Sequence, residues 1–319
     1  MTDSELRIGI VGATGAVGRV TLKYLIDRGY TDIRTFASWR SAGGQLGPFE
    51  VEEATVSALS AGELDICFFS IGTRWSRELV PVAVAAGALC IDKSAAFRLQ
   101  PGVPLVVPEV NGDRALENTG IVANPNCCTI PLTMVLAPLH DVAGVRSVRV
   151  ATYQSASGAG SQAIDDLRAE DPDDHKLGMD WEFDGVEFDE EAKLREETRK
   201  ILELPELALS ATCVRVPVVV GHAEAVWIET ETPLTPADAE RILAEAPGLR
   251  VEKIPAHGHA IGGDDVIVGR VRADPTAENG LVLFLVCDNL RKGAALNAVQ
   301  IVELLMGTSL PVYFGQRTA

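Results

Sequence analysis

The chain has 319 residues, of which 47% are hydrophobic and 23% are charged, a balance typical of globular proteins with a sizeable core. Its 28 basic and 45 acidic side chains give a formal net charge of −17, which argues against non-specific nucleic-acid binding and against docking on an anionic membrane. No apolar run is long enough to predict a transmembrane helix, and the first residues do not resemble a secretory signal. We therefore expect a cytoplasmic protein of about two domains, whose six cysteines are reduced.

Strand-like and helix-like patterns alternate over the first 92 residues. Short apolar runs predict strands at 7–12, 33–38, 65–70 and 88–92. Apolar residues at helical spacing predict helices at 17–28 and 79–86. This β-α-β alternation is typical of a doubly wound parallel sheet.

The pattern changes near residue 145, where longer strands follow one another with few crossover helices. The predicted strands are 148–154, 209–220, 223–232, 265–272 and 281–288. The predicted helices are 161–170, 190–202, 236–246 and a closing amphipathic helix at 294–306. These elements indicate a mixed or antiparallel sheet. The strongly acidic stretch 165–191 is typical of a solvated loop and helix face.

A glycine-rich turn joins the first predicted strand to the first predicted helix. It contains Gly12, Gly15 and Gly18, a G-x-x-G-x-x-G spacing rather than the common G-x-G-x-x-G fingerprint. Glycines there let the backbone approach a pyrophosphate, and the helix N-terminus offers N–H groups to it. Within a β-α-β unit this turn predicts dinucleotide binding, and an ordinary tight turn is the alternative.

The end of the second predicted strand indicates which dinucleotide is bound. An NAD site usually places a carboxylate there, which holds the ribose 2′-hydroxyl. This strand is instead followed by Ser38, Arg40 and Ser41. Guanidinium and hydroxyl groups donate hydrogen bonds to a 2′-phosphate, so the sequence favours NADP over NAD. A surface arginine in a polar turn is the alternative.

The segment 124–131, Asn-Pro-Asn-Cys-Cys-Thr-Ile-Pro, predicts a rigid turn before a helix. Thr129 is the candidate N-cap, and Pro131 fits the first turn. Cys127 would then lie at the helix N-terminus, where the helix dipole lowers a thiol pKa and favours the nucleophilic thiolate. We expect Cys128 to pack beside this site. A small buried hydrophobic residue is the alternative reading of either cysteine.

A thiolate nucleophile needs a base and a partner for the oxyanion. His222 is the best candidate base, because it follows a glycine at the end of an apolar strand. Arg215 lies inside that apolar run, where an unpaired charge is costly, so we expect it to bind an anionic substrate unless it forms a structural ion pair. His257 and His259 have no further metal ligand nearby, and we expect no metal site.

Seven short motifs are spread over nearly the whole chain. They are GATGAVG at 12–18, ASWRSAG at 37–43, PLVVPEVN at 104–111, NPNC at 124–127, YQSASGAG at 153–160, ATCVRVP at 211–217 and DNLRKGAA at 288–295. With these motifs the chain resembles the aspartate-β-semialdehyde dehydrogenase family. The resemblance implies a Rossmann-type NADP-binding domain, 1–126 with 294–319, and a mixed-sheet α/β catalytic and dimerisation domain, 127–293.

The resemblance also implies a reaction: NADPH-dependent reductive dephosphorylation of L-aspartyl-4-phosphate to L-aspartate 4-semialdehyde through a cysteine thioester. This is a step towards lysine, threonine, methionine and diaminopimelate. It implies a small-molecule substrate, phosphate and a homodimer or homotetramer as partners, with no nucleic acid and no membrane.

Residue roles follow from the same resemblance. It implies Cys127 as nucleophile, His222 as general acid and base, and Gln154 as the residue that orients the acyl intermediate. The implied substrate contacts are Arg215 for the carboxylate, Arg98, Lys193 and Asn126 for the phosphate, and Glu190 for the amino group. The implied cofactor contacts are Gly12, Thr14, Gly15, Ala16, Val17, Ser38, Arg40, Ser41, Ser157, Gly158 and Asn289. Read without the resemblance, Glu190 and Lys193 have the spacing of an ordinary surface ion pair.

Three other functions use the same scaffold. An N-acetyl-γ-glutamyl-phosphate reductase usually carries its cysteine in a P-G-C motif, which 124–127 does not match. An acyl-CoA reductase is a second alternative, and an inactive nucleotide-binding paralogue is a third, although the chain retains both Cys127 and His222. A short-chain dehydrogenase is excluded, because none of the four tyrosines is followed four residues later by lysine.

Some positions depart from the family pattern. Cys128 stands where many members carry Ser or Thr, and Lys93 and Ala96 replace residues that are often Asn and an aromatic. The segment 171–190 is short and acidic compared with many members, so a family role for that loop stays open.

Overall fold

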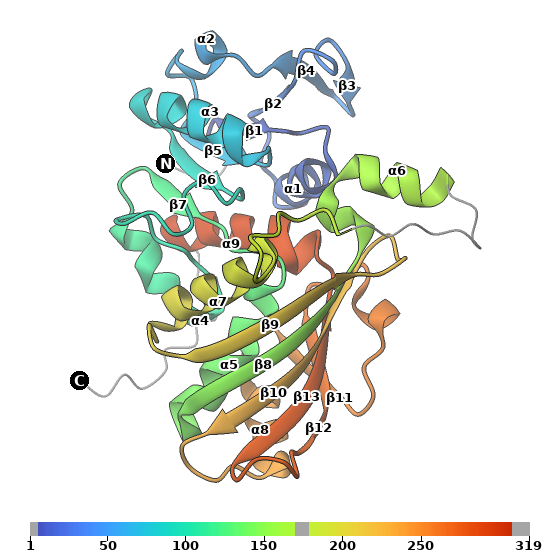
Figure 1. Ribbon diagram of the computed structural model, residues 1–319. Coiled ribbons are helices and arrows are strands. Elements are labelled where there is room, and N and C mark those ends of the chain that lie inside the picture. The colour runs from blue at the N-terminus through green and yellow to red at the C-terminus, as the bar shows by residue number, and fades with distance from the viewer. Residues whose placement is uncertain (1–5, 170–178, 308–319) are drawn as a thin grey trace. The chain divides into compact units, whose positions relative to one another are not determined.

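The computed structural model describes residues 6–169 and 179–307, and their contacts divide the chain into two compact units (Figure 1). Of the described residues, the first unit contains those up to Pro125 and those of 294–307, and the second contains those between Asn126 and Gly293. The last part of the predicted closing segment, 308–319, lies outside the described residues.

The first unit is built on a seven-stranded sheet in the order β3-β4-β2-β1-β5-β6-β7. The strands are β1 (Ile8–Val11), β2 (Ile33–Ala37), β3 (Gln45–Leu46), β4 (Phe49–Glu53), β5 (Ile66–Phe69), β6 (Leu89–Asp92) and β7 (Ile121–Ala123). In the described sheet β3 pairs antiparallel with β4, and the other neighbours are parallel. The chain leaves β1 towards β2 on one side and reaches β5 on the other, so the carboxyl end of β1 is the switch point where doubly wound sheets bind ligands.

Helices complete the core of this unit. They are α1 (Ala16–Asp27), α2 (Val56–Leu59), α3 (Thr73–Ala85), α4 (Pro108–Asn111), η2 (Gly112–Glu117) and α9 (Leu296–Leu305). The buried side chains of Ile8, Ile10 and Phe68 pack in one cluster with Leu25 of α1 and Ile301 of α9. The late segment α9 is thus part of the first core, since its apolar face is covered there.

The second unit contains a six-stranded sheet in the order β11-β12-β13-β10-β8-β9. The strands are β8 (Val145–Gln154), β9 (Ala208–Arg215), β10 (His222–Thr230), β11 (Leu249–Glu252), β12 (Val266–Ala273) and β13 (Gly280–Cys287). The outer pairs β8–β9 and β11–β12 are parallel and the inner pairs are antiparallel, which confirms the expected mixed sheet.

Two helices of the second unit, α5 and α8, cover one face of this sheet (Figure 1). The helices of this unit are α5 (Thr129–Ala143), η3 (Ala156–Ala159), α6 (Ser161–Ala169), α7 (Asp189–Leu202), α8 (Pro236–Glu245) and η4 (His257–Ala260), and the π-helical turn η5 (Arg291–Ala295) follows the sheet. On β8 the side chains facing α5, such as Val148 and Val150, are buried, whereas the alternate side chains Arg149 and Tyr153 are exposed.

Most predicted elements are confirmed to within two residues, β8 begins three residues before the predicted 148, and the following differences concern the site or are larger. The predicted strand 209–220 ends at Arg215, because Pro217 has no N–H for the ladder and the next residues bond instead to Ala156 and Ser157. As a result, His222 begins β10 rather than ending a strand. The predicted helix 79–86 is only the second half of α3, which starts at Thr73.

Candidate active site

The turn between β1 and α1, which we call the glycine turn (residues 12–18), has a backbone that other residues could not adopt. Gly12 has a φ of +88°, and a Cβ there would lie 2.4 Å from the carbonyl oxygen of Ser70. A Cβ on Gly18 would lie 2.2 Å from the carbonyl oxygen of Gly12. Gly15 is the N-cap of α1 and carries no capping side chain, so the N–H groups that open the helix remain available for an anion. This cradle fits a dinucleotide pyrophosphate.

Next to the glycine turn lies a cavity of about 420 Å³ within the first unit. Gly12, Ser38 and Arg40 line it, and the Arg40 guanidinium stacks 5.5 Å from the ring centroid of the exposed Trp39. Glu53 also lines it, because the end of β4 pairs with the end of β2. Sequence reasoning missed this carboxylate, since it searched only the second strand for one.

Two other features of this unit concern the predicted contacts Thr14 and Arg98. The carbonyl oxygen of Thr14 in the glycine turn accepts a hydrogen bond from Arg19 Nε at 3.0 Å. Arg98 is buried, and its guanidinium donates to the carbonyl oxygens of Asn124 at 3.0 Å and of Lys93 at 2.5 Å. Its side chain is therefore held in a fixed direction by backbone groups of its own unit.

In the second unit, the start of α5 holds the two adjacent cysteines. Asn126 organises this turn: its side-chain oxygen accepts from the Cys128 N–H at 2.8 Å, and its amide nitrogen donates to Glu190 at 2.8 Å. The helix starts at Thr129 with Cys128 in the N-cap position. The predicted N-cap role of Thr129 is thus wrong. The Asn126 side chain accepts the Cys128 N–H at this turn, and the buried Thr129 hydroxyl accepts no backbone hydrogen bond.

The half-buried Cys127 lies against the fully buried His222. The distance between Cys127 Sγ and His222 Nε2 is 3.1 Å. His222 Nδ1 accepts the backbone N–H of Ser155 at 3.1 Å, so the ring proton of the neutral imidazole is on Nε2 and faces the sulfur. This is the arrangement of a thiolate with an adjacent acid and base.

The pKa values separate Cys127 from the other five cysteines, all of which lie in the described part of the chain. A hydrogen bond with Cys128 lowers the pKa of Cys127 most; burial acts in the opposite direction, and the hydrogen bond with His222 lowers the pKa further. Burial raises the pKa of Cys128 well above its usual range and that of Cys213 to about 12. Sequence reasoning attributed the lowered pKa of Cys127 to the helix dipole and missed the contribution of Cys128 to that pKa. The two adjacent cysteines in the sequence were the signal that could have indicated it.

Strand register explains why residues far apart in sequence meet here. Arg215, Gln154, His222 and Cys287 are direct neighbours across β9, β8, β10 and β13, and we call them the first row. The buried Gln154 donates from Nε2 to Thr152 at 3.2 Å and accepts at Oε1 from Arg215 at 3.5 Å. The predicted residues Gln154, His222 and Arg215 therefore share one sheet face.

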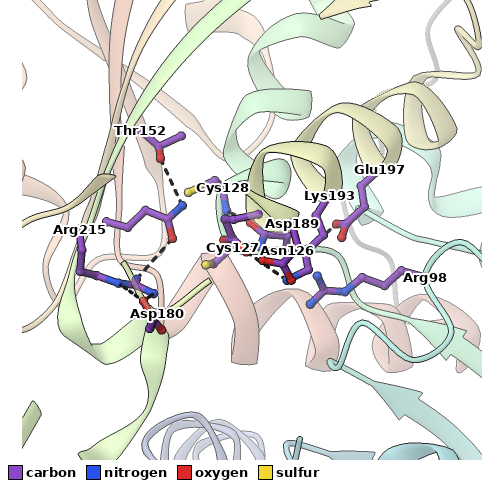
Figure 2. Close-up of polar contacts among 12 residues, drawn as sticks. Arg98, Asn126, Cys127, Cys128, Thr152, Asp180, Asp189, Lys193, Glu197 and Arg215 are labelled. Atoms are coloured by element: carbon purple, nitrogen blue, oxygen red, sulfur yellow. Dashed lines mark hydrogen bonds and ion pairs between the residues drawn. The ribbon is translucent and has the colours of Figure 1, made fainter. Parts of the chain in front are cut away.

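Arg215 forms the ion pair that was the alternative to a substrate contact. Its Nε and Nη2 donate to one carboxylate oxygen of Asp180 at 3.0 and 2.7 Å (Figure 2). Its Nη1 donates to the Ser155 carbonyl at 3.1 Å, and Trp181 stacks 4.5 Å below the guanidinium. The Ser155 carbonyl thus holds Nη1 of Arg215. The Nε–Nη2 edge, which has the geometry to bind a carboxylate, faces the partly exposed Asp180.

The predicted pair on α7 also lies beside the cysteine turn. Lys193 Nζ is 3.5 Å from Glu190 and 2.6 Å from Asp189, and Glu190 is nearly buried against Asn126. These contacts place an ammonium group and two carboxylates next to the start of α5. A charged group of this kind can bind a phosphate or an amino group.

Ser157, Gly158 and Asn289 lie next to the first row. Asn289 Nδ2 donates to Ser157 at 2.9 Å, and its Oδ1 accepts from the Gly221 N–H at 2.8 Å. A Cβ on Gly158 would lie 3.2 Å from His222 Nε2 and 2.9 Å from Arg215 Nη1, so a larger residue would crowd both side chains. The structure therefore brings these three predicted cofactor contacts together with His222.

Comparison with known proteins gives each unit the same class. Residues 7–118 match the family model of the semialdehyde dehydrogenase NAD binding domain, and residues 136–292 match that of the semialdehyde dehydrogenase dimerisation domain. None of the described helices is long and apolar enough to cross a membrane.

Relatives that match over nearly their whole length show which semialdehyde dehydrogenases the chain is similar to. The chain is 43% identical to the aspartate-semialdehyde dehydrogenase of Streptomyces akiyoshiensis over 94% of this chain and 98% of the relative. It is 42% identical to that of Aquifex aeolicus over 95% and 99%. Aspartate semialdehyde dehydrogenase II from Vibrio cholerae has a similar solved structure, with a TM-score of 0.89 and 37% identity over 96% and 99% of the two chains. The chain belongs to the aspartate-semialdehyde dehydrogenase family.

Proposed function

We propose that this enzyme catalyses the NADPH-dependent reductive dephosphorylation of L-aspartyl-4-phosphate to L-aspartate 4-semialdehyde. The observation that carries the proposal is the 3.1 Å contact between the Cys127 sulfur and the fixed ring of His222. The family membership supports it, and so does the glycine turn at the switch point of the first sheet.

The first step uses Cys127 as the nucleophile. Its thiolate attacks the acyl carbon of the acyl phosphate, a C–S bond forms, and the C–O bond to the phosphate breaks. Phosphate leaves with the bonding electron pair, so cationic groups that bind it stabilise the transition state. We assign this role to Lys193 and to the backbone-anchored Arg98, with Asn126 as a further contact.

The second step reduces the resulting thioester, which accepts a hydride more readily than a carboxylate does. The glycine turn, Ser38, Arg40 and Ser41 would hold NADPH, which would supply the hydride for this step. His222 Nε2–H donates to the oxyanion that develops on the former carbonyl oxygen. The C–S bond then breaks, the aldehyde leaves, and Cys127 returns to the thiolate. Gln154 orients the acyl group from the adjacent position of the first row.

Substrate recognition rests on charges at the edge of this site. We assign the α-carboxylate to the Nε–Nη2 edge of Arg215, which already holds a carboxylate group in Asp180. We assign the amino group to Glu190, whose side chain lies beside Asn126. An N-acetylated substrate has no charged amino group for Glu190, so this site favours a free amino acid.

We also propose that the enzyme is a homodimer located in the cytoplasm. The match to a dimerisation domain supports the dimer, as does the sheet face opposite α5, which carries the half-exposed aromatic side chains of Tyr153, Trp227 and Phe284. Six free thiols are usual in the reducing cytoplasm. Light scattering should give about twice the 34.0 kDa mass of one chain, and a monomer or a tetramer would contradict the dimer.

The reverse reaction tests the proposed activity. Aspartate semialdehyde, phosphate and NADP should yield NADPH with the wild-type enzyme, and omission of phosphate should stop the reaction. Cys127→Ser should be inactive, whereas the matched Cys213→Ser variant of a buried thiol should remain active. Formation of NADPH with N-acetylglutamate semialdehyde, or with coenzyme A in place of phosphate, but not with the expected substrates, would contradict the proposal.

A further inference from the structure

The Trp181 ring contacts the face of the Arg215 guanidinium, and this contact has no part in the mechanism above. The central guanidinium carbon lies 4.5 Å from the centroid of the ring. The Arg215 side chain is only 6% exposed, although the Asp180 carboxylate that it binds is 44% exposed. A guanidinium that has lost this much water is attracted to an aromatic face as well as to hydrogen-bond acceptors.

Hydrogen bonds to the protein fix only one end of this guanidinium once substrate is bound. Nη1 of Arg215 donates to the Ser155 carbonyl at 3.1 Å and to Gln154 Oε1 at 3.5 Å. Nε and Nη2 donate to Asp180, which the substrate carboxylate would replace. A bidentate ion pair requires the two N–H groups and the carboxylate to lie in one plane. Because both remaining hydrogen bonds are made by Nη1, they leave this plane free to tilt, and the flat ring of Trp181 sets it.

A further set of contacts holds the Trp181 ring itself. It packs against the ring of Phe188, with 6.1 Å between the centroids. The Phe188 N–H donates to one carboxylate oxygen of Glu191 at 2.9 Å, and the other oxygen accepts from the Cys213 N–H at 3.0 Å. Cys213 precedes Arg215 by two residues on β9. One buried carboxylate therefore joins the aromatic pair to the strand that carries Arg215.

We propose that Trp181 is a positioning residue for substrate binding: its ring holds the Arg215 guanidinium in the plane in which the Nε–Nη2 edge binds the substrate α-carboxylate. The proposal rests on the proposed function, which assigns that carboxylate to Arg215. Trp181 acts through Arg215 and not on the reacting atoms at Cys127. This gives a function to a residue of the loop whose role the family resemblance left open.

Steady-state kinetics of the reverse reaction test the proposal. Trp181→Leu removes the aromatic face, so KM for aspartate semialdehyde should rise about tenfold while kcat changes less than about twofold. Trp181→Phe keeps an aromatic face and should bring KM back to within about threefold of wild type. Phe183→Leu is the matched control with an unchanged KM, because the Phe183 ring lies on the same hairpin but packs on Phe188, at 5.2 Å between centroids.

An Arg215→Lys background separates positioning of the guanidinium from a general effect on the fold. Lysine keeps the positive charge but has no planar fork, so KM is already raised and there is no plane for a ring to set. Trp181→Leu in this background should therefore raise KM by less than about twofold further. A full tenfold rise there would overturn the proposal. An unchanged KM in the single variant, or a loss confined to kcat, would overturn it as well.

Circular dichroism and the Kd for NADPH show whether each variant is folded. Should Trp181→Leu fail to fold, Trp181→Gln, which places a polar chain at this partly exposed position, carries the same expectation. A wild-type enzyme that forms no NADPH from aspartate semialdehyde would contradict the proposed function. An active wild type whose KM is the same in the Trp181 variants would contradict only the role of Trp181.

Discussion

The glycine turn of the first unit and the first row of the second unit are built in different ways. The glycine turn uses adjacent residues, 12–18, and offers backbone N–H groups whose approach depends on missing side chains. The first row collects Arg215, Gln154 and His222 from three strands, and it depends on the side chains themselves. Substitutions should therefore act on these two regions in opposite ways: an added Cβ should damage the turn, and a lost functional group should damage the row.

The largest effect should come from Cys127→Ala. It removes the only thiol with a lowered pKa among the described residues, so turnover should fall at least about a thousandfold. NADPH affinity, measured by fluorescence titration, should stay close to wild type, because the glycine turn is untouched. Near-normal turnover would remove Cys127 from the mechanism.

The pH dependence of thiol reactivity should separate Cys127 from buried thiols. The pKa of Cys127 is lowered, so its alkylation should persist at neutral pH and be lost as pH falls through that lowered pKa, where the sulfur regains its proton. Cys213, whose pKa is raised to about 12, should stay unlabelled at neutral pH in the folded protein. Equal labelling of both cysteines by mass spectrometry would contradict the separation.

Gly18→Ala should have the opposite pattern of effects to Cys127→Ala: it should weaken NADPH binding and leave Cys127 reactive. The new Cβ would meet the Gly12 carbonyl oxygen at 2.2 Å, so the turn must shift, and the Kd for NADPH should rise about tenfold or more. The alkylation rate of Cys127 should be unchanged in the same variant, which serves as the internal control. Unaltered NADPH binding would show that the turn does not hold the cofactor.

Arg40→Ala should act on one cofactor only. Loss of a charge-assisted contact to the 2′-phosphate should weaken NADPH binding about tenfold, whereas NADH binding should change less than about twofold. Glu53→Gln, in the same cavity, is the matched comparison, and it should leave NADPH binding no weaker. Equal losses for NADPH and NADH in Arg40→Ala would exclude a 2′-phosphate contact.

The smallest effect should come from Asp180→Asn. The Asp180 carboxylate occupies the edge of Arg215 that we assign to the substrate carboxylate, so its removal should lower KM for aspartate semialdehyde about threefold with kcat nearly unchanged. The matched control is Asp184→Asn on the same segment, whose carboxylate accepts from backbone N–H groups instead of Arg215. A raised KM in Asp180→Asn would mean that Asp180 itself binds the substrate.

Local sequence patterns predicted much of this molecule because they depend on neighbouring residues. The β-α-β alternation, the glycine turn and the position of Cys127 before a helix follow from periodicity and from backbone stereochemistry. The same reasoning chose Thr129 as the N-cap and extended a strand to residue 220, since it did not weigh the Asn126 side chain or the missing N–H of Pro217.

Other parts of the site required the tertiary structure. Glu53 reaches the cofactor cavity because β4 pairs with β2, and Asp180 meets Arg215 across 35 residues of sequence. Cys128 is adjacent to Cys127 in the sequence, but only its burial in the folded unit shows that the two thiols differ.

The sequence by itself determined the residue types, the local turns and the family to which the chain belongs. Only the tertiary structure decided which side chains share a row and which thiols are buried. The physical reason is that strand register and burial are properties of the whole sheet, whereas turn and helix signals are properties of a few adjacent residues.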